Sequence, residues 1–283
     1  MPAVKDALHF VRWRVVPVRY AGRVAQRLAA PRVPTAGGRT AVDAQLRELG
    51  HAPGPRIPAD LLAQMQALYR PRTEQVVPTT GGHPFTNLFR PEDATSDNPV
   101  FRFAVSPEVL DRAHDYFDGD FRFDSIQVLY SWPTERHSES QMWHRDYGDS
   151  KSFHCVAYLN DVLTPEDGPF GYIDRIDTRE RIAKSPFIRR ITDEQFAREL
   201  GEGRQHVFYG KAGESVLIDP AACYHYGSRC RTPRLALFVT FNSARPFVPA
   251  QPMIRGRVEA TAAAAQAVRP DLSPAYLQRI FAA

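Results

Sequence analysis

Short runs of strand-forming residues fill the second half of the chain, and they constrain its fold more than any other feature. From about Phe121 onward, Val, Ile, Phe and Tyr gather in segments that are too short for helices and are bounded by turn residues. The strands predicted in this way are residues 125–132, 153–159, 170–173, 214–218 and 235–241. Many short strands within one domain are typical of a β-sandwich or a jelly roll.

Helical patterns precede these strands and flank them. Ser106 is a candidate N-cap, and Thr192 and Gln195 stand at the spacing of a capping box. The helices predicted from caps and apolar stripes are residues 41–49, 59–69, 107–117 and 193–200, followed by an Ala-rich helical tail from residue 258 that Pro270 and Pro274 interrupt. The predicted fold class is therefore mainly β with flanking helices.

The charge of the chain is unevenly distributed. Its 283 residues carry a net charge of +4, but the first 39 hold eight basic residues and one acidic residue. We therefore predict a basic helical N-terminal extension over residues 1–39 and a β-rich domain over residues 40–283. Because that second part is slightly acidic, we do not expect the protein to bind nucleic acid.

The N-terminal extension has two interpretations. Arg12, Arg19, Arg23 and Arg27 recur at spacings that place them near one face of a helix. Such a helix could make a peripheral contact with an anionic membrane. Alternatively, its apolar side packs on the β-rich domain and its arginines are solvated. The sequence leaves both interpretations open.

The expected compartment follows from features that the sequence lacks. No apolar run approaches the roughly 20 residues of a membrane span, and the first residues do not have the layout of a signal peptide. Cys155, Cys223 and Cys230 cannot form a complete disulfide framework, so we expect reduced and mostly buried thiols. These features predict a cytoplasmic protein. They do not indicate an oligomeric state.

A His-x-Asp motif, His144 and Asp146, stands immediately before a predicted strand. Residues two apart on an extended chain point to the same side, so this imidazole and this carboxylate can converge on one ion. The motif is weak evidence alone, because His137 and Glu139 form a rival pair with the same spacing. The rival pair lies in a polar stretch that we expect to be a loop, where side chains are held less rigidly.

Two residues further along the chain strengthen the metal-site hypothesis. His225 follows the turn at Asp219, and Arg234 opens an apolar strand. Two histidines and one carboxylate form the facial triad of non-haem Fe(II) sites, which leaves positions for a chelating 2-oxo acid and for O₂. A buried arginine needs an anionic partner, and a two-point contact with the distal carboxylate of 2-oxoglutarate would provide one. The predicted cofactors are therefore Fe(II), 2-oxoglutarate as co-substrate, and O₂.

An ordered series of motifs then carries a resemblance to a known family. The stretch 143–146 (Trp-His-Arg-Asp), followed by 158–162 (Tyr-Leu-Asn-Asp-Val), 167–170 (Asp-Gly-Pro-Phe), His225 and Arg234, resembles the phytanoyl-CoA dioxygenase family of 2-oxoglutarate oxygenases. The similarity spans roughly residues 125–241. It implies a double-stranded β-helix, a cupin-like jelly roll, in which His144, Asp146 and His225 bind iron and Arg234 binds 2-oxoglutarate.

The chain departs from the family pattern in two places. Residues 172–175 read Tyr-Ile-Asp-Arg where relatives often have Pro-Gly-Ser-His. Gly227 stands where some relatives have a hydroxyl residue that helps to hold the co-substrate, and the neighbouring Ser228 is a candidate to replace it.

Other polar residues near these motifs are further candidates for the site. His154 shares a strand face with Tyr158, and Gln127 and Tyr130 precede the metal motif on another strand. Each is a candidate for contact with the co-substrate or the pocket, or is an ordinary half-buried or exposed polar residue. The basic segment 175–190 is either a solvated charged face or an anion-binding lid over the active site.

The predicted activity is hydroxylation of a small organic substrate, with formation of succinate and CO₂ and with no catalytic residue beyond the metal centre. The basic features favour an anionic or lipid-linked substrate over a neutral one, and a natural-product scaffold is a further candidate. Desaturation and ring formation remain open as alternative outcomes. A zinc hydrolase with the same ligands and a catalytically silent cupin-like binding protein are the alternatives. Arg234 argues against the first of these, and the intact triad argues against the second.

Overall fold

The computed structural model describes residues 41–78, 83–146, 148–184, 190–201, 203–244, 246 and 256–282. The predicted N-terminal extension, residues 1–39, lies outside these ranges, so both interpretations of its basic helix remain predictions. None of the helices in the described ranges is both long enough and apolar enough to cross a bilayer.

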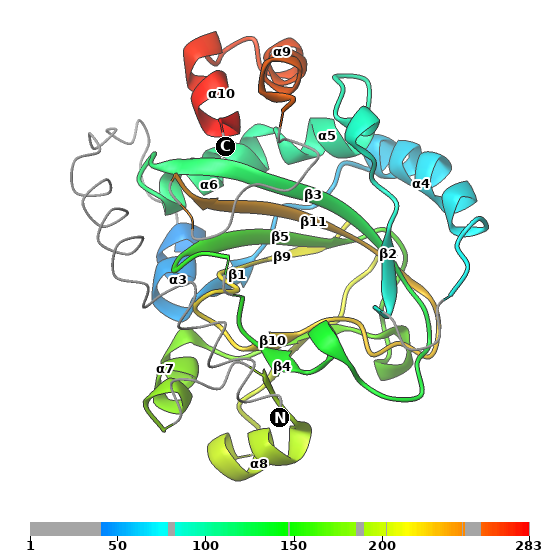
Figure 1. Cartoon of the computed structure of the whole chain (residues 1–283), viewed down its shortest axis with the longest axis vertical. Helices are drawn as coiled ribbons and strands as arrows, with labels where there is room; N and C mark the ends of the chain where they lie inside the picture. The colour runs from blue at the N-terminus through cyan, green and yellow to red at the C-terminus, as the bar shows by residue number, and fades with distance from the viewer. Residues whose placement is uncertain are drawn as a thin grey trace.

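Two antiparallel β-sheets face each other and form the body of the protein (Figure 1). The larger sheet has the strand order β1-β9-β5-β11-β3-β2, and the smaller sheet has the order β7-β4-β10-β6-β8. The strands are β1 (His51–Pro53), β2 (Phe85–Asn87), β3 (Phe121–Ser131), β4 (Trp143–His144), β5 (Ser152–Tyr158), β6 (Phe170–Tyr172), β7 (Arg190–Ile191), β8 (His206–Phe208), β9 (Ser215–Ile218), β10 (His225–Tyr226) and β11 (Arg234–Ser243). The prediction of a two-layer β fold is confirmed.

Eight helices of the described ranges surround the sheets. In Figure 1, α5, α6, α9 and α10 lie on the outer side of the larger sheet, and α7 and α8 lie beyond the smaller one. The helices are α3 (Ala41–Leu49), α4 (Ala59–Thr73), α5 (Pro99–Ala104), α6 (Arg112–Tyr116), α7 (Arg175–Lys184), α8 (Asp193–Leu200), α9 (Val258–Val268) and α10 (Pro274–Phe281). The predicted flanking helices are therefore present, including the tail that breaks between α9 and α10.

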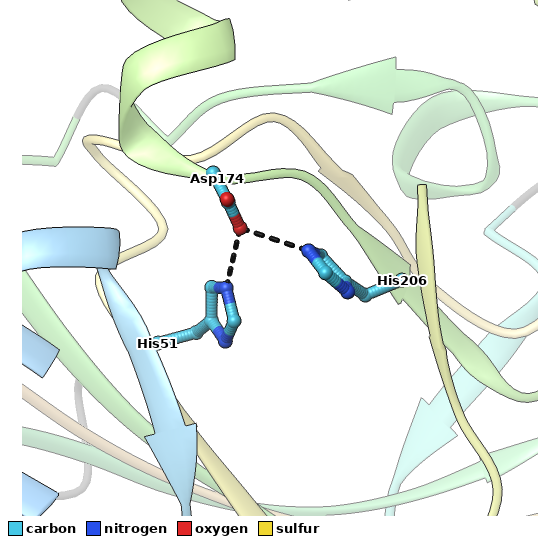
Figure 2. Close-up of side chains that lie close together, drawn as sticks. All are labelled: His51, Asp174 and His206. Carbon is cyan, nitrogen blue, oxygen red and sulfur yellow. Dashed lines mark hydrogen bonds and ion pairs between the residues drawn. The ribbon is translucent and has the colours of Figure 1, made fainter. Parts of the chain in front are cut away.

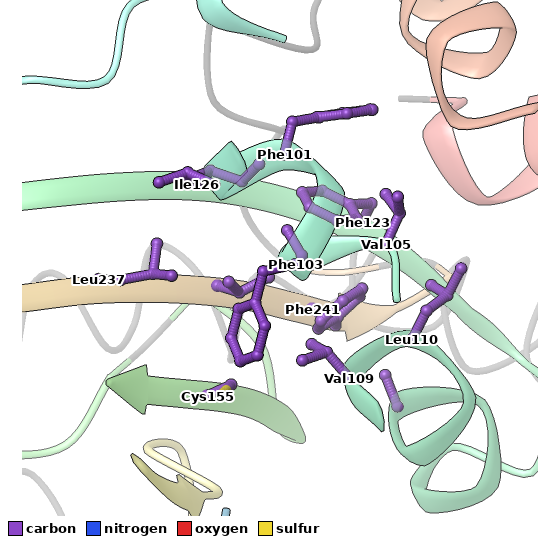
Figure 3. Packing of buried hydrophobic residues seen from close by; sticks show 14 of the residues in the cluster. Phe101, Phe103, Val105, Val109, Leu110, Phe123, Ile126, Cys155, Leu237 and Phe241 are labelled. Atoms are coloured by element: carbon purple, nitrogen blue, oxygen red, sulfur yellow. The ribbon is translucent and has the colours of Figure 1, made fainter. Parts of the chain in front are cut away.

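The central strands of the larger sheet are buried on both faces, which explains why they read as continuous apolar runs. On β5, Phe153 and Cys155 belong to the outer core under the helices, whereas Val156 and Tyr158 belong to the core between the sheets. Figure 3 shows the outer core, where Phe103 and Val109 of the helical layer lie against the sheet. All three cysteines are free and buried, as predicted.

The starts of the helices follow the predicted capping signals in part. Thr192 and Gln195 form the capping box that opens α8. Ser106 does occupy an N-cap position, but its hydroxyl has no hydrogen-bond partner among the described residues. The helix that follows Ser106 begins with a π-helical turn, Pro107–Asp111, before α6.

The basic segment 175–190 includes a buried arginine, so it is not wholly a solvated charged face. Arg181 on α7 is fully buried; its Nε lies 2.8 Å from a carboxylate oxygen of Glu199, and its guanidinium lies over the Tyr224 ring. Burial of a guanidinium is tolerated because this carboxylate and this ring surround it. The interpretation as a solvated face is therefore wrong for Arg181. The alternative of a lid stays a prediction.

We expect Phe241→Ala to lower the free energy of unfolding by about 3–5 kcal/mol, because the substitution leaves a cavity in a close-packed cluster. Phe241 is fully buried, and its ring meets those of Phe121, Phe123 and Phe153 at centroid distances of 5.8, 4.8 and 5.7 Å. Urea unfolding measures the change. The control Leu163→Ala, at a residue that is 52% exposed, should change stability by less than about 0.5 kcal/mol. Equal losses in both variants would contradict this view of the core.

Candidate metal centre

The pairing of β4 with β10 brings two predicted metal ligands together. His144 lies directly opposite His225 in the smaller sheet, and their ring centroids are 4.2 Å apart. Asp146 follows β4 by two residues, and its N–H donates to the carbonyl of Pro220, in the turn before β10. Backbone pairing on both sides of the site thus fixes where these three residues lie.

The three side chains converge on one point. Oδ1 of Asp146 lies 3.6 Å from Nε2 of His144 and 3.9 Å from Nε2 of His225. The three candidate ligand atoms all lie within 4.8 Å of one another. Bonds of about 2.0–2.1 Å place neighbouring ligands about 3 Å apart, so side-chain shifts of less than about 1 Å would close the set around an ion.

The backbone fixes the tautomers of both histidines. Nδ1 of His144 lies 2.8 Å from the carbonyl oxygen of Met142, and Nδ1 of His225 lies 3.1 Å from that of Cys223. A carbonyl oxygen only accepts hydrogen bonds, so each Nδ1 carries the proton and donates it. In the neutral form of each ring the Nε2 lone pair is then directed to the site, which is the arrangement that metal-binding histidines require.

His154 lies beside the three converging residues. Its Nε2 is 3.8 Å from Oδ2 of Asp146, the oxygen that does not face the two histidines. Burial lowers the pKa of His154 to about 4, although the carboxylate of Asp146 acts in the opposite direction. A neutral His154 can donate one hydrogen bond to Asp146 or to a bound molecule.

Arg234 opens β11 and is buried between the sheets. Its Nη1 donates to the carbonyl oxygen of Gly168 at 2.5 Å, and its guanidinium lies 5.8 Å from the centre of the Tyr158 ring. Its Nε has no hydrogen-bond partner in the described part of the chain. Burial lowers the pKa of Arg234, because a cation in this position has lost most of its solvation.

The side chain of Ser228, like that of Arg234, lies beside Gly168. A Cβ atom at Gly168 would lie 2.5 Å from the Ser228 Oγ, and Gly168 adopts a φ of +69°, so only glycine suits this position. The Ser228 Oγ is buried and also has no hydrogen-bond partner among the described residues. Two unpaired donors, from Arg234 and Ser228, therefore lie around one glycine, as an anionic group would require.

The pairing of β3 with β11 places two further candidates, Gln127 and Tyr130, on opposite faces of the larger sheet. Gln127 lies opposite Phe238 of β11, whose side chain belongs to the core between the sheets, so Gln127 faces the interior. Tyr130 lies opposite Leu235 and packs against the outer core under the helices. The candidate role of Tyr130 in the pocket is wrong, because residues three apart on a strand point to opposite faces.

The rival pair does not converge. Nδ1 of His137 lies 4.0 Å from a carboxylate oxygen of Asp193, whereas Glu139 accepts a hydrogen bond from Arg190 at 2.6 Å. Two neighbouring side chains that turn to different partners do not form a common ion site.

A buried carboxylate beside the site was missed by the sequence analysis. Asp219 is fully enclosed, and its Oδ1 accepts backbone hydrogen bonds from Ser152, Ala221 and Ala222. Its Oδ2 accepts from Tyr116 at 2.5 Å and from Arg175 at 3.2 Å. The available signal was an Asp-Pro pair after a strand, which is typical of a side chain that caps its own turn. This network holds the turn that leads into His225.

A cationic cavity lies next to this network. Its volume is about 300 Å³, and Arg175 and Arg179 of α7 line it together with Arg145 and Lys151. Burial lowers the pKa of Lys151 to about 8. Arg175 and Arg179, two residues of the basic segment, thus face a cavity of their own.

The fold is shared with solved structures, two of which are described as dependent on, or in complex with, alpha ketoglutarate. Three similar solved structures are the epimerase SnoN in complex with Fe³⁺, alpha ketoglutarate and nogalamycin RO, the non-heme alpha ketoglutarate dependent carbocyclase SnoK from nogalamycin biosynthesis, and EctD from S. alaskensis in its apoform. Their TM-scores are all 0.51, at 13%, 16% and 18% sequence identity. The matches cover 72%, 76% and 79% of this chain and 82%, 88% and 87% of the respective structures.

At these identities the similarity establishes the fold alone. The predicted double-stranded β-helix is confirmed. No protein-family model matches the sequence, and no curated protein sequence matches it either. The resemblance to the phytanoyl-CoA dioxygenase family therefore stays a prediction.

We expect Asp219→Ala to lower the free energy of unfolding by about 3–5 kcal/mol, because it leaves Arg175 and three backbone N–H groups buried without their acceptor. Chemical denaturation of both the variant and the parent measures the difference. The matched control is Asp193→Ala, which removes an exposed carboxylate paired with Arg229 and should cost less than about 1 kcal/mol. A loss as small as that of the control would contradict the importance of the Asp219 network.

Proposed function

We propose that this protein is an Fe(II)- and 2-oxoglutarate-dependent oxygenase that hydroxylates a small organic substrate. One observation carries the proposal: the same barrel interior holds two imidazoles and a carboxylate around a common point, and a buried arginine with an unpaired Nε. The first feature suits a metal ion and the second suits a carboxylate.

The donor set fits a facial Fe(II) site. His144 and His225 offer Nε2 lone pairs because their Nδ1 protons are donated to backbone carbonyls. Asp146 supplies one negative charge, and its side chain is 32% exposed while those of the two histidines are 6% exposed. The more exposed side, next to Asp146, is the one from which small molecules would approach. Iron bound here with 2-oxoglutarate and O₂ would supply the oxidising chemistry, with release of succinate and CO₂.

The residues around Gly168 fit the distal carboxylate of 2-oxoglutarate. Arg234 offers its free Nε–H there, and Ser228 offers its hydroxyl. An ionised carboxylate would satisfy both donors and neutralise the buried guanidinium, which otherwise carries a large desolvation cost. Gln127 and His154 face the same interior and are the side chains that we assign to lateral contacts with the co-substrate.

The reaction type and the substrate class are part of the proposal. SnoN and SnoK are by their descriptions an epimerase and a carbocyclase, so one fold serves several outcomes. We assign hydroxylation of an anionic, lipid-linked or natural-product substrate in the cytoplasm. For residues 1–39, a peripheral contact with an anionic membrane stays the alternative to packing on the β-rich domain.

Anaerobic titration with Fe(II) and 2-oxoglutarate distinguishes the proposal from a zinc hydrolase and from a silent binding protein. Chelation of iron by a 2-oxo acid gives a weak visible charge-transfer absorption, which neither alternative produces. Addition of O₂ should then yield succinate. If no such band appears at saturating concentrations of both ligands, the proposal is wrong.

Replacement of His144, Asp146 or His225 with Ala should reduce succinate formation to less than a few per cent of the parent, because iron would lose one of three protein ligands. Coupled detection of succinate measures this loss. His137→Ala and Glu139→Ala are the controls, since both side chains have partners outside the site, and both should retain most of the activity. Any triad variant that keeps substantial turnover removes that residue from the proposed ligand set.

Arg234→Leu should raise the concentration of 2-oxoglutarate needed for half-maximal activity by roughly 30- to 1,000-fold while iron affinity is retained. A charge-assisted two-point contact in a buried pocket contributes about 2–4 kcal/mol. Arg229→Leu is the matched control, because Arg229 pairs with the exposed Asp193 and lies over the ring of Tyr226.

The Arg234→Lys variant, which keeps the positive charge, tests whether misfolding explains the effect. It should restore part of the affinity for 2-oxoglutarate, and thermal unfolding of all three variants shows whether the fold is intact. An unchanged 2-oxoglutarate requirement in a folded Arg234→Leu protein would reject the proposed role.

A further inference from the structure

A second group of two imidazoles and a carboxylate lies apart from the proposed iron site. Figure 2 shows His51 and His206 turned toward the carboxylate of Asp174. The same oxygen, Oδ1, lies 2.6 Å from Nε2 of His51 and 2.8 Å from Nε2 of His206. The group has the residue composition of the proposed iron triad, and its ligand atoms are likewise within 4.8 Å of one another.

The three residues come from separate parts of the fold. His51 begins β1, an edge strand of the larger sheet, and His206 begins β8, an edge strand of the smaller sheet. Asp174 lies between β6 and α7. The group therefore bridges the edges of the two sheets, where each strand has only three residues and few backbone hydrogen bonds to hold it.

An aromatic ring orients both imidazoles. The ring of Tyr172 lies 4.7 Å from that of His51 and is stacked with that of His206 at 5.4 Å. Tyr172 is also the residue opposite both His206 and His225 in the smaller sheet. His206 and His225 are therefore two strand spacings apart, about 10 Å, so the two groups cannot share one ion.

The electrostatics of the group suit a cation. Burial lowers the pKa of His51, which favours the neutral ring that a metal ion requires of an imidazole ligand. The side chain of Asp174 is 27% exposed and that of His206 is 46% exposed, which leaves a path from solvent. Arg175 does not neutralise the carboxylate beside it, because its guanidinium donates to Tyr116, Asp219 and the backbone of Arg47.

We propose that His51, Asp174 and His206 bind a divalent cation, for which Zn²⁺ is the best match. Imidazole nitrogen and carboxylate oxygen are ordinary zinc ligands, and a water molecule would complete a tetrahedron. Zinc bonds of about 2.0–2.2 Å place the ligand atoms about 3.0–3.5 Å apart, so the group need open by less than about 1 Å. The ion takes the place of the protons that Nε2 of His51 and Nε2 of His206 direct at Asp174. A neutral imidazole keeps one ring proton, so this proton moves to Nδ1 by exchange with solvent and the Nε2 lone pair binds the ion. Bound zinc would fasten β1 to β8.

The test uses the full-length protein without an affinity tag, stripped with a chelator, incubated with Zn²⁺, desalted and analysed for metal per chain. We expect two equivalents in the parent and one in His206→Ala. The matched control is His83→Ala, which removes an exposed histidine that belongs to neither group and should leave two equivalents. Equal zinc contents in the parent and in His206→Ala would overturn the proposal.

The His206→Gln variant separates metal binding from the loss of a hydrogen bond. Glutamine can still donate to Asp174 but is a poor zinc ligand, so thermal stability without metal should match the parent while one equivalent is lost. Retention of both equivalents by this variant would also overturn the proposal.

A His144→Ala variant reports on the other group independently. It should lose the zinc bound at the proposed iron site and keep the zinc bound by His51, Asp174 and His206. The double variant of His144→Ala with His206→Ala should bind none. If the parent holds one equivalent that only His144→Ala removes, the second site does not exist. If only His206→Ala removes it, the second site stands and the proposed iron site fails.

Discussion

The pairing of the short central strands of the smaller sheet is the constraint on which the rest of the site depends. β10 pairs with β4 on one side and with β6 on the other, which places His144, His225, Tyr172 and His206 in one row across four strands. Directly opposite residues of antiparallel strands share a face, so all four side chains point into the space between the sheets. A slip of one residue in β10 would turn His225 outward and dismantle the candidate iron site.

Polar groups are concentrated in an interior that is otherwise apolar. Each of them needs a partner, because a buried polar atom without one costs free energy. Asp219 finds its partners in Tyr116, Arg175 and three backbone N–H groups. Arg234 and Ser228 each keep a donor without one in the described chain. Asp219, whose oxygens all have partners, therefore stabilises the fold, whereas the donors of Arg234 and Ser228 suit a ligand.

The fold alone does not decide the reaction. Structures with the same architecture are described as an epimerase and as a carbocyclase, so the chemistry depends on residues placed inside a common barrel. The proposed iron site and the proposed zinc site use the same two residue types, yet they differ in surroundings. Nε2 of His144 and Nε2 of His225 lie 3.6 and 3.9 Å from a carboxylate oxygen of Asp146, with Nδ1 of each ring against a backbone carbonyl. Nε2 of His51 and Nε2 of His206 instead lie within hydrogen-bond distance of Asp174.

The sequence by itself determined the long strands, the capped helices and the pair His144 and Asp146, because these depend on local periodicity and spacing. His225 joined them as a candidate ligand through the ordered series of motifs that resembles a known family. It could show that Gln127 and Tyr130 face opposite sides of a strand, but not which side is the interior. Strands of two or three residues, such as β4 and β10, have no periodicity to detect and exist only through their pairing partners. The burial of Arg181 and the meeting of His51, Asp174 and His206 were decided only by the tertiary structure. Neither follows from local sequence, since the contacts that create them join segments far apart in the chain.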